Sequence, residues 1–197
     1  MKNIFTVLLL LVSSFVWAQD TISVSYTSTE DMFMKKIMEF QGIEGFEVNV
    51  KGTVKDMPYK LFMVRCKNGQ VERKELAKDI PCEMDSVAQF YFFAQPESKD
   101  TLHLGCSYRV GLDLHIPIMT KDHILMETLP VKAYTVKDRI PLITYTSGSA
   151  IKFTFNGQTV EGISYCNVRF SKIHPSEWYQ KFGLKDYFYI ELEFFPH

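Results

Sequence analysis

The stretch Val110-Gly111-Leu112-Asp113-Leu114-His115-Ile116-Pro117-Ile118 decides the fold class of this chain. Aliphatic residues occupy every second position of it, with glycine, aspartate, histidine and proline between them. Successive side chains of a strand point to opposite faces, so this alternation predicts a β-strand with one apolar face. Pro117 has no N–H to donate to a neighbouring strand, which favours an edge position or a strand end.

The same period of two recurs along most of the chain. Asn68-Gly69 and Asn156-Gly157 each predict a hairpin, because this dipeptide favours the tight turn between antiparallel strands. In the first hairpin Arg65 would face Glu72, a favourable cross-strand pair. The apolar run 88–94 predicts a strand in the middle of a sheet. Further strands are expected at 20–27, 46–51, 61–67, 70–76, 101–106, 124–127, 131–136, 142–146, 151–155, from 159 onward, and at 187–195.

Two helices are predicted. Ser28 and Asp31 form a capping-box start, and apolar residues follow at helical spacing up to Gly42. A second, short helix opens near Pro175 and closes at Gly183. Three methionines in the first helix suggest either a peptide-binding groove or, as we favour, a stripe facing the core: Met32, Met34 and Met38.

Together these elements predict a mostly β protein, an antiparallel β-sandwich or barrel-like domain with one or two short helices. The alternative is an α+β roll in which the helix over 29–41 covers one sheet. No internal repeat, linker or low-complexity tract interrupts the pattern, so residues 19–197 are expected to form a single β-rich domain.

The first 18 of the 197 residues read as a signal peptide. Lys2 precedes a short apolar run, and the small residues Val16 and Ala18 stand at the −3 and −1 positions of a cleavage site. The run is shorter than the ~20 residues of a membrane-spanning helix, which makes a retained membrane anchor the less favoured alternative. We therefore expect an exported protein, periplasmic or extracellular after cleavage near Ala18.

Charge and composition narrow the classes of partner and cofactor that the chain is expected to bind. Without Lys2 the chain has 21 basic and 23 acidic side chains, a net charge of −2. A net negative chain does not attract nucleic acid, so no nucleic-acid partner is predicted. No phosphate-binding loop, H-E-x-x-H motif, EF-hand loop or dinucleotide fingerprint occurs in the sequence, so no cofactor or metal is predicted.

Four cysteines in an exported chain allow three disulfide pairings. They are Cys66, Cys82, Cys106 and Cys166. We favour Cys66–Cys82 with Cys106–Cys166, because the first two are closest in sequence. Buried free thiols are the alternative.

The candidate catalytic residues lie on the polar face of the predicted strand 110–118. Asp113 and His115 project from the same face, and His103 joins them if strand 101–106 pairs alongside. Two histidines and a carboxylate can hold a transition metal or supply a general base with an orienting acid. An ordinary solvent-facing position on an amphipathic strand is the more economical interpretation.

The candidate binding residues are aromatic. In the last strand tyrosines alternate with carboxylates on the predicted outer face, and such an arrangement can bind glycans or protein partners. Strand propensity alone also favours tyrosine there. The residues are Trp178, Tyr179, Tyr187 and Tyr189, beside Glu191 and Glu193.

Three triplets read Asp, then Ser or Thr, then an aliphatic residue: Asp20-Thr21-Ile22, Asp85-Ser86-Val87 and Asp100-Thr101-Leu102. They resemble the acceptor triplet for protein O-glycosylation in exported Bacteroidetes proteins. With its leader and aromatic-rich β pattern, the chain resembles small uncharacterised exported envelope proteins of those bacteria. This resemblance implies no activity and no functional residue.

Two functional hypotheses follow. The first is an exported, non-enzymatic binding domain for a protein or glycan of the cell envelope. The second is a small exported metal-dependent hydrolase that uses His103, Asp113 and His115.

Overall fold

The computed structural model describes residues 21–28, 31–77, 83–129 and 133–195. The predicted signal peptide and its cleavage site at Ala18 lie outside these residues. Within the described residues, no helix has the length and apolar character needed to cross a membrane.

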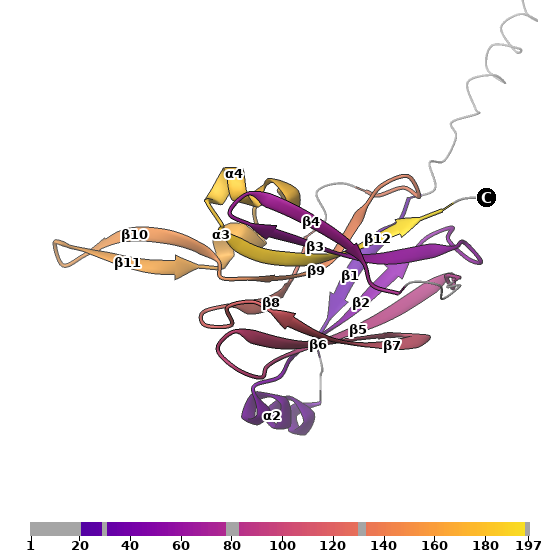
Figure 1. Ribbon diagram of the computed structural model, residues 1–197, viewed down its shortest axis with the longest axis horizontal. Coiled ribbons are helices and arrows are strands. Elements are labelled where there is room, and N and C mark those ends of the chain that lie inside the picture. Colours follow the sequence, from indigo (N-terminus) through magenta and orange to yellow (C-terminus); the bar gives the residue numbers. More distant parts are fainter. Residues whose placement is uncertain (1–20, 29–30, 78–82, 130–132, 196–197) are drawn as a thin grey trace, which may run out of the picture.

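Ten of the strands in the described residues form two antiparallel five-stranded sheets, which pack face to face as the predicted sandwich (Figure 1). The first sheet has the order β1-β2-β5-β6-β7. Its strands are β1 (Ser23–Thr27), β2 (Glu44–Lys51), β5 (Val87–Pro96), β6 (Thr101–Tyr108) and β7 (Val110–Pro117).

The second sheet has the order β4-β3-β12-β9-β8. Its strands are β3 (Tyr59–Lys67), β4 (Gln70–Glu75), β8 (Ile124–Glu127), β9 (Ile140–Thr146) and β12 (Asp186–Phe194). The remaining two strands, β10 (Ser149–Phe155) and β11 (Gln158–Ser164), form a hairpin that projects from one end of the sandwich (Figure 1).

Several positions in the sheets were predictable. β7 is an edge strand, as its proline indicated, and β5 is the middle strand of its sheet. Both Asn-Gly hairpins are confirmed, with positive φ angles of 51° at Asn68 and 81° at Gly69. Arg65 faces Glu72 as expected, although its ion pair, 3.3 Å long, is with Asp186 on the other neighbouring strand.

One predicted strand is wrong in its described part. Residues 133–136 form no strand, and the segment contributes only an isolated bridge between Tyr134 and Ile22. Tyr134 is nevertheless buried in the core. Its aromatic and β-branched neighbours gave the segment a strand-like composition, while tertiary packing uses it as a covering loop.

The main apolar core lies between the two sheets. β5 contributes Ala88, Phe90, Phe92 and Ala94, all fully buried, and the strand β12 faces them with Phe188, Ile190, Leu192 and Phe194. Burial on alternate residues of β5 shows that only one face of this sheet is in the core. Its other face carries α2 (Met32–Gln41), which lies apart from the sandwich on that side (Figure 1).

A second apolar cluster covers the outer face of the second sheet. It is built under three short helical segments: α3 (Cys166–Arg169), η1 (Pro175–Glu177) and α4 (Trp178–Phe182). Pro175 opens η1 and Gly183 ends α4 in a left-handed conformation, as the sequence predicted. The strands β9 and β12 of the second sheet are therefore buried on both faces, whereas β5 of the first sheet is buried on one.

The described cysteines are free thiols. Cys66 and Cys106 are buried in different clusters, and Cys166 is exposed at the start of α3, so the predicted Cys106–Cys166 disulfide is not formed. Cys82, the predicted partner of Cys66, lies outside the described residues. Burial raises the pKa of the Cys106 thiol to about 12, which keeps it protonated and unreactive at neutral pH.

Candidate functional site

Helix α2 is an amphipathic helix that contributes no buried residue to the core. Asp31 caps it by accepting a hydrogen bond from the backbone N–H of Met34 at 2.8 Å, so the N-cap lies three residues later than the predicted cap at Ser28. Gly42 ends it as expected. The predicted core-facing stripe is wrong, because no residue of α2 is buried, and Phe33 and Phe40 are 75% and 92% exposed.

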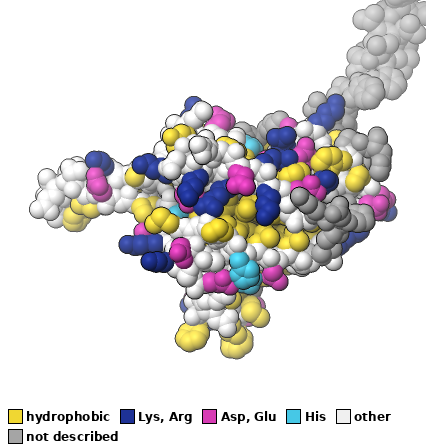
Figure 2. All heavy atoms as spheres, viewed as in Figure 1, with side chains coloured by type: hydrophobic (Ala, Val, Ile, Leu, Met, Phe, Trp, Pro, Cys, Tyr) yellow, Lys and Arg dark blue, Asp and Glu magenta, His cyan; other side chains and the backbone are white. Residues whose placement is uncertain are grey.

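The helix is attached to the outer face of the first sheet by a few contacts. The side-chain amide of Gln95 on β5 donates a hydrogen bond to the backbone oxygen of Gln41, at 3.0 Å. The methyl group of Met38 fits over Gly45 on β2, where a Cβ atom would lie only 2.7 Å from it. Figure 2 shows apolar side chains grouped at this outlying end of the molecule, where α2 lies in Figure 1.

A half-open cavity of about 630 Å³ lies between α2 and the sheet. Its lining is mostly apolar. The roof comes from the helix and the floor from β2 and β5, with Met34, Ile37, Met38, Tyr91 and Phe93 as the main apolar side chains. This volume lies within the ~300–1,000 Å³ of pockets that bind small molecules.

The strand register explains the hollow floor. Gly45, Phe93, Gly105 and Asp113 stand side by side on β2, β5, β6 and β7. A glycine therefore lies on each side of the Phe93 ring. Met38 fills the hollow at Gly45, but the hollow at Gly105 is open, since a Cβ there would meet no heavy atom closer than 3.9 Å.

Acidic groups mark the polar part of the lining. Asp113 is at one side and Glu47 at another, and none of the described lining residues is Lys or Arg. The side-chain amide of Asn49 donates to Glu47 at 2.7 Å. The imidazole Nε2 of His103 lies 3.1 Å from Oδ1 of Asp113, within range for its N–H to donate to the carboxylate.

The predicted trio of His103, Asp113 and His115 is brought together as the assumed strand pairing requires. His103 and His115 face each other across β6 and β7 with stacked rings 5.0 Å apart. Their polar atoms do not converge, because Nδ1 of His115 contacts Glu97 at 2.9 Å while His103 contacts Asp113. Among the described residues, no three His, Cys, Asp or Glu side chains are placed to hold one metal ion.

The predicted aromatic strip is mostly buried, which corrects the expectation that this face of the last strand is exposed. Trp178, Tyr187 and Tyr189 are 2%, 1% and 3% exposed, and only Tyr179 reaches the surface, at 39%. The reason is that η1 and α4 fold back over this face of β12. The indole of Trp178 donates to the backbone oxygen of Ile173 at 2.9 Å.

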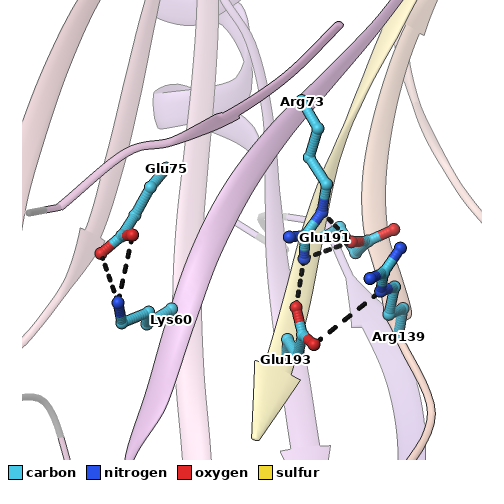
Figure 3. A network of polar contacts seen from close by, with 6 residues as sticks. All are labelled: Lys60, Arg73, Glu75, Arg139, Glu191 and Glu193. Atoms are coloured by element: carbon cyan, nitrogen blue, oxygen red, sulfur yellow. Dashed lines mark hydrogen bonds and ion pairs between the residues drawn. The ribbon is translucent and has the colours of Figure 1, made fainter. Parts of the chain in front are cut away.

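The carboxylates of the same face are paired rather than available to a ligand. Arg73 on β4 contacts both Glu191 and Glu193, and Arg139 lies 3.8 Å from Glu193 (Figure 3). Glu191 is 3% exposed, so burial raises the pKa of its carboxyl, and the guanidinium of Arg73 opposes that rise.

The sequence analysis names His103 and Asp113 as candidates and raises a groove at the methionines of the first helix, but it does not predict this cavity, although three signals are present. Two glycines, Gly45 and Gly105, interrupt strands, and a glycine inside a strand often marks close approach of another group. The third signal is the run of methionines in α2, which suit an adaptable apolar surface. Only the register shows that these features meet.

Comparison with known proteins found no match: no family model, no curated protein and no solved structure matches this chain.

Proposed function

We propose that this chain is an exported, non-enzymatic binding domain that takes up a small, largely apolar molecule between α2 and the first sheet. The observation that carries the proposal is an amphipathic helix, none of whose residues is buried, held over a cavity with an apolar lining. Apolar surface left in water is costly, and concave apolar surface with a few polar groups is typical of ligand sites.

This proposal moves the binding surface away from the last strand. The alternation of aromatic and acidic side chains predicts a glycan or protein partner at that strand. In the structure most of these aromatic side chains are buried, and the carboxylates are paired with Arg73. The hydrolase hypothesis gains no support either, since the two histidines contact different carboxylates.

Filling the open hollow tests the site. We expect Gly105→Phe to weaken binding of the neutral apolar dye N-phenyl-1-naphthylamine about tenfold, because the new ring occupies space the ligand needs. Dye fluorescence, which rises on transfer from water to an apolar site, gives the affinity. The substitution needs no strained backbone, since φ at Gly105 is not positive and the nearest atoms are 3.9 Å from a Cβ.

Gly111→Phe is the matched control. Gly111 lies on the outer face of the neighbouring strand, has no heavy atom within 4 Å of a Cβ, and is not part of the lining. This variant should bind the dye like the unmodified protein. A wild-type protein without saturable dye binding, or equal losses in both variants, would refute the proposed site.

Export is tested separately. We expect protein recovered from its host to begin at Gln19, because cleavage follows Ala18, and to be found outside the cytoplasm. Intact-mass measurement on separated cell fractions gives both results. A chain that retains residues 1–18 in the membrane fraction would show that the leader is an anchor.

A further inference from the structure

We propose that the ligand of this cavity carries a cationic group, which binds in the open hollow at Gly105 beside Asp113 while its apolar part lies beneath α2. The inference rests on the proposed function, because it names the ligand class of the same cavity. It selects a small amphiphilic cation, such as an alkylammonium compound, over neutral or anionic apolar molecules.

The hollow has the right neighbours for a cation. It is bounded by Phe93 on one side and by Asp113 on the other, since these residues flank Gly105 in the strand register. Oδ1 of Asp113 would lie 3.9 Å from a Cβ at Gly105, so a group bound in the hollow lies next to a carboxylate, which favours positive charge there.

Asp113 is available to a ligand. Its side chain is 79% exposed, and its contact with His103 uses Oδ1. A carboxylate can accept several hydrogen bonds at once, so this contact orients the group and leaves it able to accept from an ammonium. Charge-assisted hydrogen bonds of this kind are stronger than neutral ones.

The charge of the cavity lining as a whole also favours a cationic ligand. Glu47 adds a second carboxylate, and the described lining offers an anion no Lys or Arg side chain. The cavity is therefore complementary in charge to a cation and in polarity to a short alkyl or aryl chain. Figure 2 shows a histidine between acidic side chains on this side of the molecule, above the apolar end.

The test compares three ligands with one chain and three head groups: n-octylammonium, 1-octanol and octanoate, each below its micelle concentration at pH 7. Isothermal titration calorimetry of the full mature protein gives the affinities. We expect octylammonium to bind about tenfold more tightly than octanol, and octanoate to bind more weakly than octanol.

Asp113→Asn should remove the preference, so that octylammonium and octanol bind this variant with similar affinity. Glu97→Gln is the matched control, since Glu97 is an acidic residue near the same histidines but not part of the lining. It should retain the preference.

The outcomes separate the two proposals. If none of the three ligands binds, the proposed function fails together with this inference. If octanol and octylammonium bind equally, or octanoate binds best, the cavity is a binding site but the cationic ligand is wrong. A preference that survives Asp113→Asn would also overturn the inference.

Discussion

Replacing Trp178 with alanine is expected to lower the free energy of unfolding by about 4 kcal/mol, because large aromatic side chains removed from a core cost ~3–5 kcal/mol. Trp178 is 2% exposed and lies in the apolar cluster under α4. Its ring packs on Tyr187, with centroids 5.8 Å apart. The substitution loses this packing and also the hydrogen bond from the indole to Ile173.

Equilibrium denaturation in urea measures the effect, and Tyr179→Ala is the control. Tyr179 is the next residue of the same short helix but is 39% exposed, with its ring against Gly69. Its loss should cost about 1 kcal/mol or less. If Trp178→Ala were no more destabilising than Tyr179→Ala, the helical cover over the second sheet would not be part of the stable fold.

The buried position of Trp178 shows which features of this part of the fold the sequence could predict and which it could not. The period-two pattern of β12 correctly separates Phe188 and Ile190 from Tyr187 and Tyr189. It states that the strand has two faces, but not what covers the second one. That cover comes from η1 and α4, whose docking depends on tertiary contacts that alternation does not encode.

The same limit applies to the candidate site. The sequence offers the pairing of β6 with β7 only as a condition, and the structure meets that condition by placing His103 beside Asp113 and His115. The cavity next to them depends on the register of four strands, which aligns Gly45 and Gly105 around Phe93. It also depends on where α2 docks, and an amphipathic pattern predicts burial of a helix rather than incomplete burial.

Replacing Arg73 with methionine is the second change with a large expected effect, about 3 kcal/mol at pH 7, because it leaves a buried carboxylate unpaired. Arg73 lies 2.8 Å from Glu191, whose side chain is 4% exposed (Figure 3). Methionine keeps an unbranched apolar stem near the ring of Phe62, over which the guanidinium now lies at 3.3 Å. Thermal or chemical denaturation gives the loss.

Lys60→Met is the matched control for that change. Lys60 pairs with Glu75 at 3.0 Å on the same sheet face (Figure 3), but the lysine side chain is 45% exposed. An exposed pair of this kind contributes about 0–1 kcal/mol. A loss in Lys60→Met as large as in Arg73→Met would mean that burial of the carboxylate is not what makes the Arg73 pair important.

The pH dependence distinguishes lost charge pairing from lost packing in the Arg73 variant. Burial raises the pKa of Glu191 above its unfolded value, and removal of Arg73 raises it further. The native variant then binds a proton at a pH where the unfolded chain does not, so its stability falls as pH rises through that interval. The difference in free energy of unfolding between this variant and the unmodified protein should therefore shrink as the pH is lowered toward the ordinary glutamate pKa.

Adding Glu191→Gln to Arg73→Met should recover most of the lost free energy of unfolding at pH 7 and remove the dependence on pH. A deficit that stays constant with pH would instead assign the loss to the contact of Arg73 with Phe62.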